Sequence, residues 1–442
     1  MERRASLHTI GCRLNQSETA VFSHQLRTSG FQVVPFGEPT DLFILNTCSV
    51  THGAEADCRR AIRQTLQRSP NAFIAVTGCY AQTGASTLGM IPGVDLIVGS
   101  QHKMAVLDLI PSLEKRNAPE IVRGNPNRND FVIDGIGHFE TTRATLKVQD
   151  GCDFMCSFCN IPFARGRERS RTMDDLLREG QALVDRGHKE IVLSGVNIGQ
   201  YESEGNSFLD VIKYLEKVSG IVRIRISSIE PTTIPDALLE HMAQSSILCH
   251  YLHVPLQSGD DDVLRGMQRR YSVCEYVEFI EKAAHIIPGA CFGTDVMVGF
   301  PGEGENEFER TVDVVNALPF SYLHVFSYSE RPGTAAEKIV EKVHPRIVKA
   351  RSRKLRDISQ SKRLASCQRY IGTTVSVLFE QRDSDGCWIG LTGTYVRVSV
   401  RADEELANKL RPVHIAGMMG DKAVGTLVAR NSRSEKHLVM VS

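Results

Sequence analysis

Three closely spaced cysteines form the pattern with the clearest chemistry in this sequence. Cys152, Cys156 and Cys159 have the spacing C-x3-C-x2-C within one loop. Three thiolates at this spacing can bind three irons of a cubane cluster and leave the fourth iron free to bind a small molecule and pass it an electron. A zinc site and three unrelated thiols remain open at this point, although structural zinc usually takes four ligands and no fourth Cys or His lies nearby.

Three further cysteines lie tens of residues apart, at Cys12, Cys48 and Cys79. Each follows a short apolar run that predicts a buried strand. These runs are residues 7–10, 42–45 and 73–76. Because the carboxyl ends of parallel strands form one rim, where sites are built, we expect the three thiols to converge there. The alternative is three separate buried thiols.

The elements that must position these cysteines fall into three regions. Residues 1–140 alternate apolar runs with helix-like stretches, which predicts an open parallel α/β sheet. Residues 141–370 contain six strand-then-helix units, which predict a partial (β/α)6 barrel followed by a basic helical extension. Residues 371–442 contain five short strands separated by turns, typical of a small all-β barrel that often binds RNA. The predicted fold class is therefore α/β.

The composition is that of an ordinary globular chain. With 42% hydrophobic and 24% charged residues, the 442-residue chain is neither disordered nor fibrous. The net charge is zero, but residues 331–370 hold twelve Lys and Arg against three acidic residues, a net charge of +9. This segment favours contact with a polyanion, and the alternative is a solvated helix face.

No secretory signal and no membrane span is evident in the sequence, so we expect a cytoplasmic protein without a membrane partner. In a reducing compartment the twelve cysteines would not form a disulfide framework. Clustered cysteines are then more consistent with metal ligands or catalytic groups.

The loop of Cys152, Cys156 and Cys159 resembles the radical S-adenosylmethionine (SAM) superfamily, and residues 160–171 resemble its methylthiotransferase branch. The other segments that agree are TIGCRLNQ (9–16), NTCSVT (46–51), TGCYAQ (77–82), PLQSG (255–259) and VGFPGE (298–303). The resemblance covers essentially the whole chain. It implies a methylthiotransferase domain in residues 1–140, a radical SAM core in 141–370 and a TRAM RNA-binding domain in 371–442.

The resemblance also implies two [4Fe–4S] clusters with separate tasks. Cys152, Cys156 and Cys159 would hold the cluster that cleaves SAM, and Cys12, Cys48 and Cys79 would hold a second cluster that carries the sulfur; all six would be catalytic. A cofactor must supply this chemistry, because no protein acid or base removes hydrogen from an unactivated aromatic C–H bond. Two SAM molecules would be used per turnover, one to methylate the sulfur and one to give a 5′-deoxyadenosyl radical.

Five positions in the barrel are candidate SAM contacts by resemblance. The backbone around Phe158 would contact adenine, and Gly195 lies where the methionine amino group is held. Ser228 and Glu230 lie at a plausible ribose site, and Asp295 lies on a later strand.

Arginines that alternate just after the cysteine loop are candidate RNA contacts. Arg165, Arg167 and Arg171 would suit the phosphates of a substrate. The alternative is a solvated charged face. In the last region, Trp388 and Tyr395 could stack on bases, but packing in the barrel core is favoured for both.

The substrate is indicated by the first cysteine segment. GCRLNQ resembles the GCKVNQ form of enzymes that act on N6-threonylcarbamoyladenosine in tRNA. The expected activity is conversion of this nucleoside, at position 37 on the 3′ side of the anticodon, to its 2-methylthio derivative. The implied partners are the tRNA anticodon stem-loop, an electron donor such as flavodoxin or ferredoxin, and a sulfur source. Alternatives are isopentenyladenosine in tRNA, an aspartate of a ribosomal protein, or a zinc-stabilised RNA-binding protein without catalysis.

Overall fold

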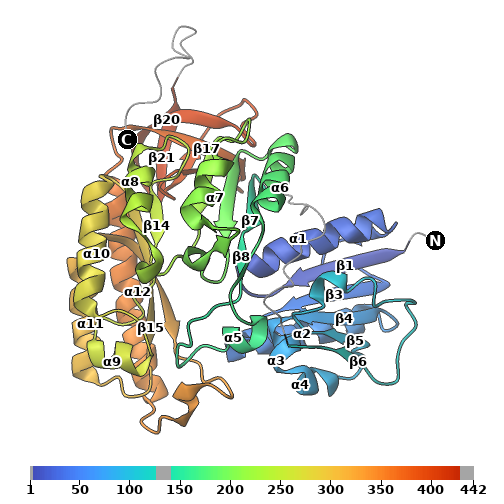
Figure 1. The fold of residues 1–442 in the computed structure, drawn as a ribbon. Helices are drawn as coiled ribbons and strands as arrows, with labels where there is room; N and C mark the ends of the chain where they lie inside the picture. The colour runs from blue at the N-terminus through green and yellow to red at the C-terminus, as the bar shows by residue number, and fades with distance from the viewer. Residues whose placement is uncertain (1–2, 126–140, 429–442) are drawn as a thin grey trace.

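The computed structural model describes residues 3–125 and 141–428, arranged as two parallel α/β units and a β-barrel (Figure 1). The first unit is a six-stranded parallel sheet of order β2-β1-β3-β4-β5-β6. Its elements are β1 (Arg4–Thr9), α1 (Arg13–Thr28), β2 (Gln32–Val34), β3 (Leu42–Thr47), α2 (His52–Arg68), β4 (Phe73–Gly78), α3 (Cys79–Thr83), α4 (Ala85–Gly89), β5 (Leu96–Val98), η1 (Lys103–Ala105) and β6 (Glu120–Val122). The predicted open parallel sheet is confirmed, and β6 is an additional edge strand.

The central strands of this sheet are buried on both faces, as expected of a continuous apolar run in a parallel sheet. In β3, Leu42 and Ile44 pack with Phe22 of α1, whereas Phe43 and Leu45 pack with Ile62 of α2. Alternate residues therefore hold one helix on each face. The parallel register brings the carboxyl ends of β1, β3 and β4 to one edge.

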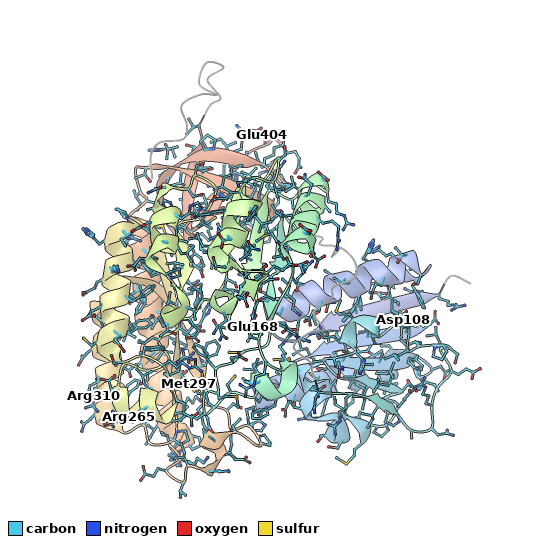
Figure 2. All side chains as sticks on the ribbon, viewed as in Figure 1. Asp108, Glu168, Arg265, Met297, Arg310 and Glu404 are labelled. Atoms are coloured by element: carbon cyan, nitrogen blue, oxygen red, sulfur yellow. The ribbon has the colours of Figure 1, made fainter. Side chains whose placement is uncertain are left out.

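The second unit contains the six predicted barrel strands in two parallel three-stranded sheets, β7-β10-β13 and β14-β15-β16. Single parallel bridges, Ile224 with Leu248 and Ser228 with His253, join the two sheets. The strands are β7 (Arg143–Lys147), β10 (Glu190–Ser194), β13 (Arg223–Ile226), β14 (Tyr251–His253), β15 (Cys291–Val298) and β16 (Phe320–Ser327). This arrangement is the predicted partial barrel. Met297, labelled in Figure 2, lies on β15.

Helices and short elements surround the barrel strands. They are β8 (Gln149–Asp150), α5 (Ile161–Arg165), β9 (Arg169–Ser170), α6 (Met173–Asp185), η2 (Ile198–Gln200), β11 (Glu202–Ser203), β12 (Asn206–Ser207), α7 (Phe208–Leu215), η3 (Pro231–Thr233), α8 (Asp236–Gln244), α9 (Asp261–Gly266), α10 (Val273–Ile286), α11 (Glu305–Ala317), η4 (Ala335–Lys338) and α12 (Pro345–Gln368). The helix α10 lies between β14 and β15, as the predicted strand-then-helix order requires. Its start has a sequence signal, because Ser272 and Glu275 form a reciprocal capping box.

The last unit is a closed barrel of order β17-β18-β19-β21-β20, consistent with a TRAM domain. Its strands are β17 (Thr374–Arg382), β18 (Trp388–Thr392), β19 (Arg397–Val400), β20 (Leu410–Met419) and β21 (Lys422–Leu427). Trp388 is buried in its core, as predicted. Tyr395 is not: it leaves this core and packs against Tyr251 and Arg225 of the larger barrel.

The small barrel contacts the amino ends of the large barrel's strands. Arg223 on β13 donates hydrogen bonds to the carbonyls of Ser376 and Leu391, at 2.6 and 3.0 Å. Arg225 donates to the carbonyls of Thr392 and Gly393. The opposite, carboxyl-end rim of the large barrel is therefore left for other contacts. No described helix is both long enough and apolar enough to span a bilayer.

Candidate active site

The predicted convergence of Cys12, Cys48 and Cys79 is found in the structure. Cys48 directly follows β3, Cys79 begins α3 after β4, and Cys12 immediately precedes α1. Each of the three thiols interacts electrostatically with the other two. At Gly11, where φ is +112°, a Cβ atom would lie only 2.7 Å from Cβ of Cys48. Only glycine allows the loop of Cys12 to approach Cys48 this closely.

Asn15, in the first turn of α1, fixes the ends of these strands. It is fully buried, and its side-chain amide donates to the carbonyls of Ile10 and Thr47, both at 2.9 Å. Its oxygen accepts a hydrogen bond from Arg165 at 2.6 Å. No local sequence pattern marks Asn15 for this positioning role.

Burial raises the pKa of Cys48 to about 11 and also raises that of Cys79, for which the charge of Arg165 acts in the opposite direction. Buried thiols of this kind lose their protons when they bind metal. Three converging thiols beside a guanidinium fit an anionic iron–sulfur cluster with one iron free of protein ligands.

The second cysteine set lies in the loop after β8. At Gly151, where φ is +73°, a Cβ atom would lie 2.0 Å from the carbonyl oxygen of Arg167, so the loop turns at a position that only glycine can occupy. The backbone N–H of Phe154 donates to Sγ of Cys152 at 3.3 Å. Burial raises the pKa of Cys152 to about 11 and that of Cys159 to about 12, and both thiols interact electrostatically with Cys156. This donor set also fits a cluster with one open iron.

Two polar side chains that the sequence analysis missed contact this loop. Arg269 donates from Nη1 to Sγ of Cys156 at 3.2 Å and pairs with Glu230. Gln200 accepts a hydrogen bond from the backbone N–H of Asp153 at 3.3 Å. Such contacts orient a ligand loop and tune its metal.

The two cysteine sets lie next to each other. Asn160, adjacent to Cys159, donates from its side-chain amide to the carbonyl and the hydroxyl of Ser49, at 3.0 and 3.1 Å, and Ser49 is adjacent to Cys48. The helices α3 and α5 pack together beside this contact (Figure 1). Arg331 also donates to the carbonyl of Ser49, at 3.1 Å.

Arg165 and Arg171 were expected to contact RNA, and the structure contradicts this. Both side chains are only 1% exposed. Arg165 lies 2.9 Å from carboxylate oxygens of both Glu18 and Asp150, and Arg171 pairs with Asp175 and Glu179. These charges are satisfied internally, so they cannot neutralise phosphates.

Arg167 is exposed and remains a predicted RNA contact. The local sequence does not distinguish the exposed Arg167 from the buried Arg165. Arg165 is buried against Glu18, which is 147 residues away along the chain. Glu168, next to Arg167, lies where the first unit meets the large barrel (Figure 2).

Two of the predicted SAM contacts, Gly195 and Glu230, are connected to the cysteine loop through other side chains. Gln149 accepts hydrogen bonds from the two N–H groups that follow Gly195, and donates to the carbonyl of Gly151 at 2.8 Å. Glu230 is linked to Cys156 through Arg269. Ser228 follows the end of β13, and Phe158 packs in a small cluster with Phe300.

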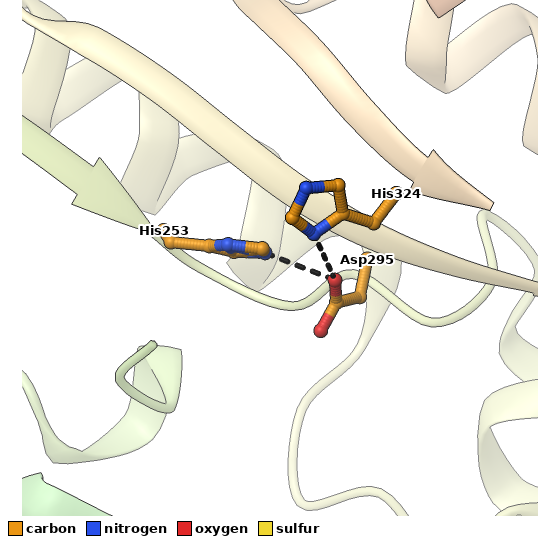
Figure 3. Close-up of side chains that lie close together, drawn as sticks. All are labelled: His253, Asp295 and His324. Atoms are coloured by element: carbon orange, nitrogen blue, oxygen red, sulfur yellow. Dashed lines mark ion pairs between the residues drawn. The ribbon is translucent and has the colours of Figure 1, made fainter. Parts of the chain in front are cut away.

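Asp295 lies within the barrel, between two histidines that the sequence analysis did not single out. Its Oδ1 is 3.0 Å from Nε2 of His253 and 3.4 Å from Nδ1 of His324 (Figure 3). Burial lowers the pKa of His253 to about 4.

A cavity of about 990 Å³ adjoins the first cysteine set. Gly11, Cys12 and Arg13 line it from the first unit, and Arg143 and Thr145 line it from β7. Its size is within the range of small-molecule sites.

Comparison with known proteins agrees with this geometry. Residues 146–315 match the Radical SAM superfamily, and residues 4–99 match a family described as "Uncharacterized protein family UPF0004". The threonylcarbamoyladenosine tRNA methylthiotransferase MtaB of Bacillus subtilis is 34% identical over 421 residues, which cover 93% of both chains. The chain belongs to the radical SAM methylthiotransferase family.

Other relatives of this methylthiotransferase support the same assignment. MtaB of Aquifex aeolicus is 36% identical and covers 81% of this chain and 88% of its own. The tRNA-2-methylthio-N(6)-dimethylallyladenosine synthase of Mycobacteroides abscessus is 31% identical, with coverage of 94% and 84%.

Among solved structures, the radical SAM methyltransferase TsrM from Kitasatospora setae, with cobalamin and a [4Fe–4S] cluster bound, matches with a TM-score of 0.56 at 14% identity, covering 76% of this chain and 77% of TsrM. This likeness concerns the fold. The family recognised in the sequence is confirmed, and the chain is a radical SAM enzyme rather than a non-catalytic RNA-binding protein.

Proposed function

We propose that this methylthiotransferase converts N6-threonylcarbamoyladenosine, at position 37 of tRNA, to its 2-methylthio derivative. The observation that carries the proposal is the contact between Asn160 and Ser49, which holds two sets of three cysteines side by side. Sulfur insertion needs hydrogen abstraction and sulfur delivery at one place. The names of the relatives from Bacillus and Aquifex support this choice of nucleoside.

The two cysteine sets would each hold a [4Fe–4S] cluster, through Cys152, Cys156 and Cys159 and through Cys12, Cys48 and Cys79. When bound, the clusters supply one-electron reduction of SAM and the sulfur to be transferred. Arg269 and the N–H of Phe154 would orient and stabilise the thiolates of the first set. The residues proposed to contact SAM are Phe158, Gly195, Ser228 and Glu230. Asp295, the fifth candidate, faces His253 and His324 instead and belongs to a different group of side chains.

Two surfaces support tRNA as the partner. The cavity beside Cys12 and Arg13 has room for a modified nucleoside. On α12, Arg346, Lys349, Arg353 and Arg356 are exposed, and they suit a phosphate backbone.

We further propose residues 1–140, 141–370 and 371–442 as the sulfur-donor, radical SAM and TRAM domains. A cytoplasmic enzyme of this class needs an electron donor such as flavodoxin or ferredoxin and a sulfur source.

Mass spectrometry of tRNA nucleosides from a strain that lacks the gene tests the substrate. The methylthio form of threonylcarbamoyladenosine should disappear while its precursor accumulates, and the wild-type gene should restore it. If methylthio-isopentenyladenosine disappears instead, the substrate is the nucleoside of the dimethylallyladenosine synthases, and the proposal is overturned.

Metal analysis tests the cofactors. After anaerobic reconstitution the chain should hold about eight irons, as two [4Fe–4S] clusters require. About four irons would contradict the second cluster.

A further inference from the structure

Three side chains of the large barrel that belong to neither cysteine set converge on one point. His253 ends β14, Asp295 lies in the middle of β15, and His324 lies on β16 directly beside Asp295 in the strand register. Figure 3 shows both imidazole rings directed at the same carboxylate oxygen. One potential ligand atom from each of the three residues lies within 4.8 Å of the other two.

The separations between these atoms are compatible with a shared metal ion. Oδ1 of Asp295 is 3.0 Å from one imidazole nitrogen and 3.4 Å from the other. Ligand atoms about 2.1 Å from a common ion are separated by about 3.0 Å in octahedral and about 3.4 Å in tetrahedral geometry. Nε2 of His253 and Oδ1 of Asp295 are buried atoms without a hydrogen-bond partner in the described structure, despite their proximity. Buried polar atoms in this state need an explanation, and a bound ion is one that the donor set here fits.

We propose that His253, Asp295 and His324 bind a divalent transition-metal ion and leave its remaining positions open. Two imidazoles and one carboxylate are the donor set of open sites for iron(II) and zinc. His253 and Asp295 are 5% and 19% exposed at their side chains, whereas His324 is 51% exposed. Two of the three ligands are thus largely shielded from solvent, and the third is accessible.

The open coordination positions of the metal ion would allow it to select the substrate. This inference rests on the proposed function. The threonylcarbamoyl group carries a carboxylate and a hydroxyl, which are oxygen ligands for such an ion. The dimethylallyl group carries neither. Arg13, which interacts electrostatically with His253, adds a cation suited to the same carboxylate.

Zinc titration of the reconstituted holoenzyme tests the site, because its cysteines are then occupied by clusters. Equilibrium dialysis with elemental analysis should find one Zn²⁺ per chain in the wild type. His324→Phe should weaken zinc binding at least about tenfold, and His253→Gln should do the same. His285→Ala, at an exposed position at the end of α10, should bind zinc like the wild type. If the His253→Gln variant does not fold, zinc binding can still be measured with His324→Phe, because the His324 side chain is more exposed.

A wild type that binds no zinc beyond its clusters, or variants that bind zinc as tightly as the wild type, would overturn the metal site. Substrate selection is tested separately, with anticodon stem-loops that carry threonylcarbamoyladenosine or unmodified adenosine. The wild type with zinc should prefer the modified stem-loop, and His324→Phe should lose that preference. An unchanged preference would refute the selection role. Zinc binding without any tRNA methylthiolation would instead refute the proposed function and leave the metal site intact.

Discussion

The side-chain amide of Asn160 donates to both the carbonyl and the hydroxyl of Ser49, at 3.0 and 3.1 Å, across 111 residues of sequence. The two residues flank Cys159 and Cys48. This contact links the two loops that bear the cysteine sets, and because Asn160 and Ser49 are both buried, water does not compete for these bonds.

Removing that contact should uncouple sulfur transfer from SAM cleavage. Asn160→Ala loses two hydrogen bonds, at a cost of about 1–3 kcal/mol in stability. We expect methylthiolation to fall about tenfold, since a small misplacement of reacting groups has a large effect on rate. SAM cleavage, followed as 5′-deoxyadenosine by chromatography, should change much less.

Asn408→Gly is the matched control, because Asn408 also donates to a carbonyl of another unit, that of Gly187 at 2.7 Å, far from the cysteines in sequence. Equal losses of methylthiolation in both variants would show a general effect on stability and contradict the positioning role.

Single cysteine variants should separate the two proposed clusters. Cys156→Ala should abolish SAM cleavage and methylthiolation together. Cys48→Ala should keep SAM cleavage, lose methylthiolation, and lower the iron content from about eight to about four. Cys274→Ala, at an exposed thiol outside both sets, should behave like the wild type. Full methylthiolation by Cys48→Ala would disprove the two-cluster assignment.

The pH dependence of stability should reveal the buried ion cluster between the first unit and the large barrel. Burial alone would raise the pKa of Glu18, but Arg165, Lys103 and Lys147 hold it well below its usual value of 4.5. The carboxylate therefore stabilises the fold at neutral pH, and this contribution is lost as the pH falls below about 4.5 toward the folded-state pKa.

Glu18→Gln should thus be less stable than the wild type by about 3–5 kcal/mol at pH 7, because buried cations lose their partner. In urea denaturation the difference should shrink at acid pH, since glutamine does not titrate. The exposed Glu240→Gln should change stability by less than about 0.5 kcal/mol. A difference that is constant with pH would rule out the ion cluster as its cause.

The basic face of α12 should contribute to tRNA affinity. Arg353 and Arg356 are exposed and one turn apart, so Arg353→Ala/Arg356→Ala should weaken tRNA binding and reduce the slope of log K against log salt concentration by about 1.5–2. Lys213→Ala/Lys217→Ala, which removes two exposed lysines near α7, is the control. Filter binding at several salt concentrations measures the tRNA affinity and its salt dependence for each variant. Identical slopes for the two double variants would refute the role of α12 in tRNA binding.

The sequence by itself determined the family, the order of the α/β units and the barrel, and the six cysteines. These features are carried by local patterns: apolar runs of strand length, the C-x3-C-x2-C spacing, and cysteines placed directly after strands. Parallel pairing then forces Cys48 and Cys79 to one edge, because Thr47 pairs with Gly78 and each cysteine follows.

Only the tertiary structure decided which charged and polar side chains serve the site. Arg165 and Arg167 are equivalent in a local pattern, yet the first is buried against Glu18 and the second is exposed. The triad of His253, Asp295 and His324 comes from three separate strands and has no sequence spacing to mark it. The physical reason is the same in both cases: burial and pairing depend on residues that are distant along the chain, and become neighbours only when the strands and helices pack.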